Sequence, residues 1–135
     1  MATCVLDSWA LMAFFQDEPA AERVERLLEQ AAAGRGKLLL SVINWGEIYY
    51  SILRTAGEAM VEQKAREITA LPIEIVPVES DLALVRQAAS YKAAKKMSYA
   101  DCFAAALAKI KKAELITGDP EFKQVANEIK IGWLK

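Results

Sequence analysis

Short apolar runs alternate with longer amphipathic segments along the chain. Runs of this length without polar alternation are typical of strands that are buried on both faces of a parallel sheet. We therefore expect four or five short strands, each flanked by polar residues or turn formers. The runs lie at residues 3–6, 37–41, 73–76, 115–117 and 130–134.

The segments between these runs carry apolar residues at helical spacing. Residues 17–19 (Asp-Glu-Pro) offer a cap and a proline at a first helical position, and Gly34 stops the helix that follows. Ser80 and Ser98 stand where they can cap two later helices. The pattern predicts helices at residues 9–15, 20–33, 44–54, 58–71, 80–94, 99–112 and 120–127.

Strands that are separated by helices form crossover units, and such units build a mostly parallel sheet with helices on both faces. The expected fold class is therefore α/β, a three-layer α/β/α sandwich with a mostly parallel sheet of four to five strands. A chain of 135 residues fits one domain, and we expect residues 1–135 to form it without a linker or an internal repeat.

The composition excludes several kinds of enzyme, because the chain has 0 histidines. Ser-His-Asp and Cys-His catalysis, paired-imidazole ribonuclease chemistry and the usual zinc sites all require histidine. The chain has neither a basic stretch before an apolar run nor a segment that approaches the ~18 apolar residues of a membrane helix. We expect a cytoplasmic protein without a membrane association, whose hydrolytic chemistry relies on carboxylates.

Charge is unevenly distributed, although the net charge is only −1. Residues 1–91 carry 8 basic and 13 acidic side chains, whereas residues 92–135 carry 9 and 5. This basic third either lines a phosphate track or is simply a solvated helical surface. The lysines concerned are Lys92, Lys95, Lys96, Lys109, Lys111 and Lys112, of which the first three are candidates for substrate binding.

Four acidic residues fall where the ligands of a parallel sheet bind, beyond the carboxyl ends of the strands. Asp7 and Asp119 follow two predicted strands, Glu47 lies one turn into a helix, and Asp101 lies in a first helical turn. Taken singly, the three aspartates are also well placed as helix caps, Asp101 in a capping box with Ser98. Taken together, they predict a shared acidic crevice.

Such a crevice needs a cation, because carboxylates about 4 Å apart repel one another by about 4 kcal/mol per pair. An all-oxygen ligand set without histidine or cysteine favours Mg²⁺ or Mn²⁺, which typically bind where a substrate phosphate completes the shell. We therefore predict phosphoryl chemistry by water that the cation activates. The hydroxyls of Ser8 and Thr117 are accessory candidates, able to bond a ligand carboxylate or a metal-bound water.

Four strings in order resemble the motifs of one family: Val5-Leu6-Asp7-Ser8, Asn44-Trp45-Gly46-Glu47, the run from Ser98 to Ala108, and Leu115-Ile116-Thr117-Gly118-Asp119-Pro120-Glu121-Phe122. Each string is weak alone, but the order, the spacing and the length of the chain make the match specific. The sequence is similar to PIN domains, in particular to the VapC-type toxin ribonucleases of type II toxin–antitoxin systems, over nearly the whole chain.

The resemblance implies a parallel sheet with the first strand at its centre and Mg²⁺- or Mn²⁺-dependent endonucleolytic cleavage of RNA that leaves a 5′-phosphate. It implies that Asp7, Glu47, Asp101 and Asp119 are the metal-site acids, supported by Ser8 and Thr117. It also implies a homodimer and a small antitoxin protein whose tail lies across the active-site groove.

Two other functions remain open at this stage. One is a PIN-type nuclease with a housekeeping role in RNA processing. The other is a receiver-like signalling module that binds Mg²⁺, although receivers pair two acids after the first strand and Asp7 stands alone.

Several aromatic residues either form the core or line an apolar groove for a partner helix. These are Trp9, Phe14, Phe15, Tyr49 and Tyr50.

Overall fold

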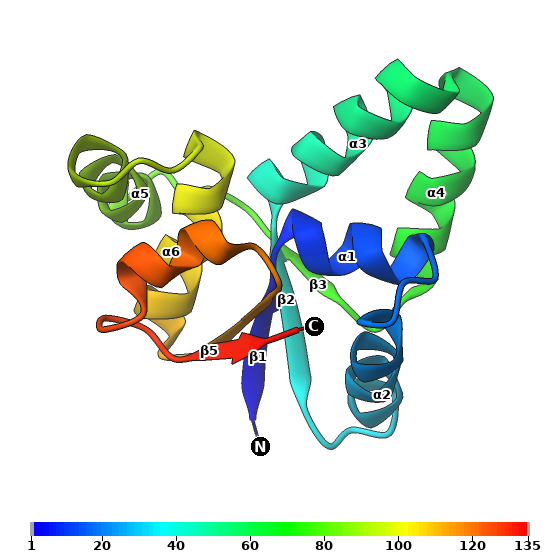
Figure 1. The fold of residues 1–135 in the computed structure, drawn as a ribbon, viewed down its shortest axis with the longest axis horizontal. Helices are drawn as coiled ribbons and strands as arrows, with labels where there is room; N and C mark the ends of the chain where they lie inside the picture. Colours follow the sequence, from blue (N-terminus) through cyan, green and yellow to red (C-terminus); the bar gives the residue numbers. More distant parts are fainter. Residues whose placement is uncertain (1, 135) are drawn as a thin grey trace.

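A central sheet of parallel strands organises the molecule, for which a computed structural model describes residues 2–134 (Figure 1). Its order is β3-β2-β1-β4-β5, and every neighbouring pair is parallel. The expected mostly parallel sheet is confirmed, with β1 at its centre. The strands are β1 (Thr3–Leu6), β2 (Lys37–Ser41), β3 (Glu74–Val76), β4 (Glu114–Thr117) and β5 (Ile131–Trp133).

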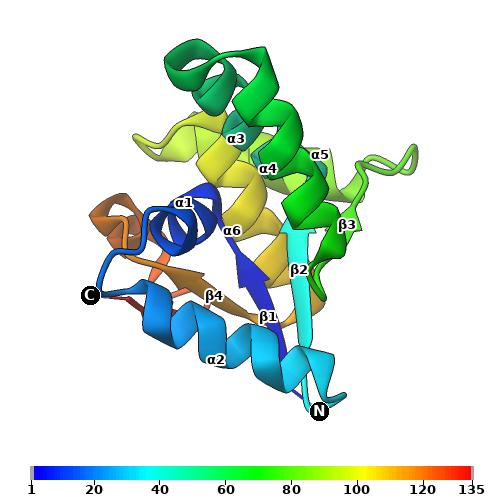
Figure 2. The same ribbon diagram turned by 90° about the vertical axis from the view of Figure 1, so that its right-hand side faces the viewer.

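Helices cover both faces of this sheet, which confirms the three-layer sandwich (Figures 1 and 2). Helices α5 and α6 pack on one face, while α1 to α4 supply the core on the other. None of the helices within residues 2–134 has both the length and the apolar character to cross a membrane. The helices are α1 (Ser8–Phe15), α2 (Ala21–Ala32), α3 (Val42–Ala56), α4 (Glu58–Ala70), α5 (Ala83–Ala94), α6 (Tyr99–Lys111) and the 3-10 helix η1 (Pro120–Val125).

The continuous apolar runs of the strands divide between two cores, because successive side chains of a strand point to opposite faces. Val5 and Leu39 contribute to the core under α5 and α6. Leu6, Leu40 and Ile116 contribute to the core under α1 to α4. All five side chains are buried. The strands are thus covered on both faces, as the unbroken apolar runs predict.

The strand order reverses at the centre of the sheet. The chain runs from β1 outward to β2 and β3, then returns to the other side of β1 to form β4 and β5. In open α/β sheets, ligands bind at such a switch point, beyond the carboxyl ends of the strands. The order also differs from the 2-1-3-4-5 arrangement of receiver domains. The receiver-like alternative is therefore contradicted by the topology.

Two predicted helix starts are wrong. The helix expected from residue 80 begins instead at Ala83, because Leu82 adopts a left-handed conformation with a φ of 69°. Asp81, not Ser80, bonds the first free amide, since its Oδ1 accepts from Ala83 N at 3.1 Å. In the same way, residues 17–19 do not cap α2, which begins at residue 21 without a side-chain cap.

Candidate active site

Asp7 lies at the carboxyl end of the central strand and is almost fully buried, with 1% of its surface exposed. Its Oδ1 accepts a hydrogen bond from Ala10 N at 2.9 Å, so the side chain caps α1. Its Oδ2 accepts from Thr117 Oγ1 at 2.6 Å across the switch point of the sheet. These bonds hold the carboxyl group of Asp7 in one orientation.

Thr117 connects two of the predicted acids. Its hydroxyl donates to Asp7 and accepts a hydrogen bond from Asp119 N at 3.0 Å. Asp119 in turn caps η1, because its Oδ1 accepts from Glu121 N at 2.9 Å. A cap and a cluster of acids are therefore compatible at this site: Asp7 and Asp119 each cap a helix and also lie beside the other acids.

Gly118, between these residues, allows a close approach to Trp9. A Cβ atom at position 118 would lie only 2.3 to 2.6 Å from three carbons of the Trp9 indole. Ordinary van der Waals contact between carbons needs about 3.5 to 4.0 Å. Glycine at this position lets the turn that carries Asp119 pack directly against the first turn of α1.

Asp101 enters the same crevice from the first turn of α6. Ser98 caps this helix by accepting from Asp101 N at 3.1 Å, so the predicted capping role of the serine is confirmed. The carboxyl group of Asp101 is 9% exposed and lines a cleft together with Glu47 and Asp119. The structure thus brings all four predicted acids to one edge of the sheet.

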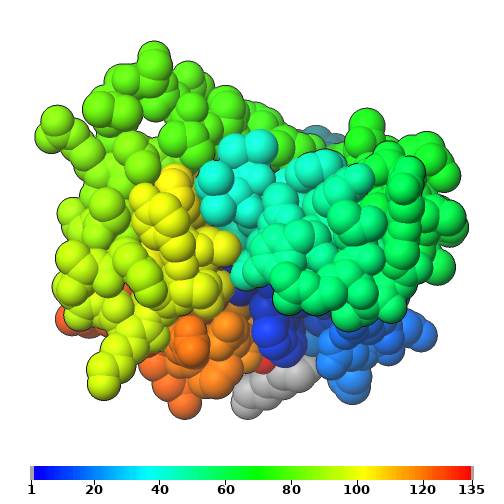
Figure 3. All heavy atoms as spheres, turned by 90° about the horizontal axis from the view of Figure 1, so that it is seen from above, coloured from blue at the N-terminus to red at the C-terminus, as the bar shows by residue number. Residues whose placement is uncertain are grey.

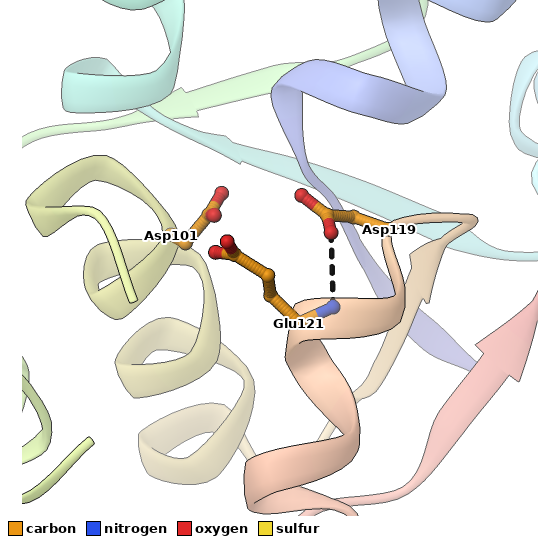
Figure 4. Close-up of side chains that lie close together, drawn as sticks. All are labelled: Asp101, Asp119 and Glu121. Carbon is orange, nitrogen blue, oxygen red and sulfur yellow. Dashed lines mark hydrogen bonds between the residues drawn. The ribbon is translucent and has the colours of Figure 1, made fainter. Parts of the chain in front are cut away.

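A fifth acid, Glu121, was not predicted from the sequence. Carboxylate oxygens of Asp101, Asp119 and Glu121 lie within 4.8 Å of one another. Figure 4 shows the three carboxylates pointing toward one another, Asp101 from α6 and the other two from the turn after β4. The Asp-Pro-Glu sequence at residues 119–121 was the available signal, since both acids then fall at the start of one short helix.

Burial and mutual repulsion perturb two of these acids. Burial raises the pKa of Asp7 to about 7, against the lowering effect of the bonds from Thr117 and Ala10. Burial, together with the nearby charges of Asp119 and Glu47, raises the pKa of Asp101 to about 7. Among the described residues, none of the ion pairs includes any of these acids.

The cleft that Glu47, Asp101 and Asp119 line has a volume of about 260 Å³. Figure 3 looks down on it and shows the dark-blue start of α1 recessed between the cyan-to-green α3, the yellow start of α6 and the orange segment after β4. Its other walls are apolar or neutral. They are formed by Ser8, Trp9, Met12, Ile48 and Ser51. The cleft is open to solvent and negative at its base.

Ser8 bonds no acid among the described residues, and its accessory role toward a metal-bound water stays a prediction. Its hydroxyl donates to the main-chain oxygen of Asn44 at 3.3 Å and accepts from Asn44 Nδ2 at 3.2 Å. The hydroxyl is occupied because α1 and α3 meet at this point. Thr117, the other accessory candidate, does bond Asp7.

The lysines of the predicted phosphate track come from several elements, and Lys95 and Lys109 both pair with Glu128. Lys92 Nζ donates to the main-chain oxygen of Met97 at 2.9 Å, and Lys95 Nζ lies 3.8 Å from Glu128 Oε2. Lys96 is exposed. These three lie near the segment that leads into α6. The remaining lysines lie in or after its last turn, about three helical turns from Asp101: Lys109, Lys111 and Lys112.

Of the two roles left open for the aromatic residues, core or groove, most of them belong to the core. Trp9, Phe14, Phe15 and Tyr49 are partly buried and pack against the core under α1 to α4. Tyr50 alone of this set is exposed, with 50% of its surface accessible. Because α1 packs across α3, aromatic side chains of both helices face the interior rather than a common groove.

Fold and site together define a class of protein: an α/β domain with a carboxylate-lined cleft at the switch point of a parallel sheet. The chain belongs to the PIN domain family, whose family model matches residues 4–128. The family resemblance found in the sequence motifs is therefore confirmed. PIN domains are nucleases.

Solved structures with the same fold include toxin–antitoxin complexes. The chain is similar to VapBC2 from Rickettsia felis bound to a promoter DNA fragment, with a TM-score of 0.73 and 15% identity over 98% of this chain and 99% of that one. DNA-bound VapBC from Salmonella typhimurium has a TM-score of 0.73 and 14% identity, with 98% of each chain covered.

A third similar structure is VapC20 of Mycobacterium tuberculosis, described as a toxin that cleaves the sarcin–ricin loop. Its TM-score is 0.68, with 16% identity over 90% of this chain and 94% of that one. At these identities the likeness establishes the fold alone. No protein of curated function matches the sequence.

Proposed function

We propose that this protein is a divalent-cation-dependent endoribonuclease that acts as the toxin of a toxin–antitoxin pair. One observation carries the proposal: three carboxylates line one open cleft, two more lie beside them, and none of the five is in an ion pair with a described cationic side chain. Such an arrangement is unfavourable by itself and becomes favourable when a cation binds. The five acids are Asp7, Glu47, Asp101, Asp119 and Glu121.

The residues fit a hard divalent cation. Carboxylate oxygens are the ligands that Mg²⁺ and Mn²⁺ prefer, and the chain has no histidine to favour zinc or copper. Asp101, Asp119 and Glu121 already lie close enough together to share one ion. Asp7 and Glu47 complete the acidic surroundings from α1 and α3. A bound ion of this kind activates water and screens the charge of a phosphate.

The protein's own side chains then orient the site and meet the substrate. Thr117 holds Asp7 through a bond of 2.6 Å, so this carboxylate needs little rearrangement when a cation binds. On the substrate side, we assign phosphate attraction to Lys96, with Lys92 and Lys95 adding positive charge nearby. The segment of Lys96 reaches η1, since Lys96 N donates to Gln124 Oε1 at 2.8 Å.

The choice of RNA and of a toxin role is supported by the structural neighbours. They are VapBC complexes and a toxin that cleaves an RNA loop. We accordingly propose a small antitoxin protein and a second copy of this chain as partners. Exposed apolar side chains on α3 and α4 offer contact surface for them, namely Tyr50, Leu53 and Met60. A housekeeping RNA-processing nuclease would share the same site.

The test is cleavage of a structured RNA by purified protein with Mg²⁺ or Mn²⁺, with and without chelator. We expect fragments with 5′-phosphates, no cleavage in chelator, and no cleavage by Asp101→Asn. Glu25→Gln is the matched control, because Glu25 is exposed on α2 and its neutralisation changes the net charge equally.

Cleavage that persists in chelator, or full activity of Asp101→Asn, would contradict the proposed nuclease. The toxin role is tested separately by expressing the active protein without a partner. Growth arrest that Asp101→Asn relieves is expected for a toxin, whereas harmless expression of active enzyme would favour the housekeeping role.

A further inference from the structure

Asn44 is a fully buried polar residue near the start of α3, with 0% of its surface exposed. In a helix, residues three, four and seven positions further on share its face. Those residues are Glu47, Ile48 and Ser51, and all three line the acidic cleft. Asn44 therefore lies at the inner end of the helical face that carries Glu47.

The side-chain amide of Asn44 joins α3 to two other helices. Its Nδ2 donates to Ser8 Oγ at 3.2 Å and to the main-chain oxygen of Ala100 at 3.2 Å. Ser8 directly follows Asp7 in the chain, and Ala100 directly precedes Asp101. One amide group thus contacts the immediate neighbours of two acids, and it lies one helical turn from a third.

The orientation of this amide is set by its partners. The carbonyl of Ala100 can only accept, so the NH₂ group of Asn44 must face it. Oδ1 of Asn44 is then buried without a hydrogen-bond partner among residues 2–134. A buried acceptor without a partner is destabilising, and a leucine of similar size would avoid that penalty. The two bonds that Asn44 Nδ2 donates act against that penalty, and both connect α3 to the elements that carry Asp7 and Asp101.

Repulsion between the acids of the cleft gives the hydrogen bonds of Asn44 a function. Asp101 and Asp119 have carboxylate oxygens within 4.8 Å of one another, and Glu47 lines the same cleft, so these like charges repel one another. This repulsion acts to separate the helices that carry them. The bonds from Asn44 to α1 and α6 oppose that separation where the helices are closest to the acids.

We propose that Asn44 is a positioning residue, whose amide fixes the spacing of α1, α3 and α6 and thereby aligns Asp7, Glu47 and Asp101 for cation binding. The inference rests on the proposed function, because it assigns to Asn44 the geometry of that same cation site. Asn44 does not itself touch the cation or the substrate in this account.

The test compares wild-type protein with Asn44→Leu, which keeps the volume of the side chain and removes both donated bonds. The dissociation constant of Mn²⁺ is measured by electron paramagnetic resonance of the free ion, and kcat and KM are measured for RNA cleavage. Loss of an outer partner of a metal site typically weakens metal binding on the order of 10-fold or more. We expect that weakening, with a lower kcat and an unchanged KM for RNA.

Ile52→Val is the matched control, because Ile52 is buried in the same helix at a distance from the acids and shares no bond with them. It is expected to lower the midpoint of thermal unfolding without changing the affinity for Mn²⁺. A merely structural Asn44 would behave in the same way. The weakened Mn²⁺ binding of Asn44→Leu, measured where both proteins are folded, separates the two roles.

If wild-type protein binds Mn²⁺ and cleaves RNA, and Asn44→Leu matches it in affinity and kcat, the inference is overturned while the proposed function stands. If the wild type itself binds no Mn²⁺, both are overturned. Should Asn44→Leu not fold, Asn44→Ser replaces it, since serine removes the amide and keeps a polar group. Reduced Mn²⁺ affinity is again expected, and an unchanged affinity overturns the inference.

Discussion

In the part of the chain that the structure describes, acidic side chains have cationic neighbours at one end of the sheet and lack them at the other. Near the amino ends of the strands, acids have cationic neighbours: Glu74 Oε1 lies 3.9 Å from Lys37 Nζ, and Glu128 Oε1 lies 3.1 Å from Lys109 Nζ. At the carboxyl ends, three acids line a cleft and two more lie beside them, and no ion pair of the described residues includes any of the five. Both ends belong to the same 135-residue chain with a net charge of −1.

This difference shows that the placement of charge identifies the site, whereas its total does not. An exposed ion pair contributes little to stability, typically up to about 1 kcal/mol, and mainly keeps charges balanced. Grouped carboxylates without cationic partners are unfavourable until a cation joins them. Charges are balanced at the amino end, whereas at the carboxyl end they are left for the cation that the proposed function requires.

The largest expected effect is on the rate of RNA cleavage, which loss of an acid should lower at the carboxyl end of the sheet but not at the amino end. Asp119→Asn should lower the rate of RNA cleavage by on the order of 100-fold, because it removes a ligand of the cation. Asparagine is as good a helix cap as aspartate, so η1 should keep its start. The measurement is the initial rate of cleavage at saturating Mg²⁺.

Glu74→Gln is the control at the other end, since it removes the same charge from the pair with Lys37. It should leave the cleavage rate unchanged and lower the free energy of unfolding by at most about 1 kcal/mol. Equal activity losses in both variants would mean that the two ends do not differ in function.

A second prediction concerns the pH dependence of stability without metal. The pKa of Asp101 is about 7 in the folded protein and 3.8 in the reference state, so the folded form binds more protons between about pH 4 and pH 7. The free energy of unfolding should therefore fall as pH rises through this window and level off above it. One such group contributes a slope of about 1.4 kcal/mol per pH unit.

Denaturant unfolding in chelator, at pH values from 4 to 8, measures this slope. Asp101→Asn should show a shallower decline than wild type, because only Asp7 then contributes a raised pKa at this end. Glu74→Gln should follow the wild type. A wild-type curve no steeper than that of Asp101→Asn would contradict the origin assigned to the slope. Saturating Mg²⁺ should oppose the decline, since the cation requires ionised ligands.

A smaller effect is expected at Gly118, where the wall of the cleft is tightly packed. Gly118→Ala should lower the free energy of unfolding by about 1 to 3 kcal/mol, because the new methyl group overlaps the Trp9 ring. Gly46→Ala is the matched control, as a Cβ at that helical position meets nothing within 4 Å. It should stabilise the protein by roughly 0.5 to 1 kcal/mol. Equal effects at both glycines would exclude the contact with Trp9 as the cause.

Much of the fold and of the site is predictable from the sequence, because the strongest patterns are local. Unbroken apolar runs such as residues 37–41 indicate strands covered on both faces, and the alternation with helices indicates parallel pairing. Asp7 directly follows the central strand, and Asp119 lies two residues after its neighbour β4. The carboxyl ends of parallel strands share one edge, so the convergence of these two acids follows from chain order alone.

The remaining features depend on contacts between distant residues. Asp-Pro-Glu places Glu121 beside Asp119 at the start of η1, but its approach to Asp101 depends on how η1 lies against α6. Asn44 bonds Ala100, which is 56 positions away. Ser8 was expected to support an acid, yet its hydroxyl is used by the packing of α1 against α3. Side-chain partners of this kind can be identified only once the relative positions of the helices are known.

The central claim is that the acids at the carboxyl end of the sheet hold a divalent cation, and an equilibrium titration with Mn²⁺ tests it most directly. We predict saturable binding by the metal-free wild-type protein and strongly weakened binding by Asp101→Asn, with Glu25→Gln equal to wild type. Equal Mn²⁺ affinities of the wild type and Asp101→Asn, or no saturable binding by either, would contradict the claim.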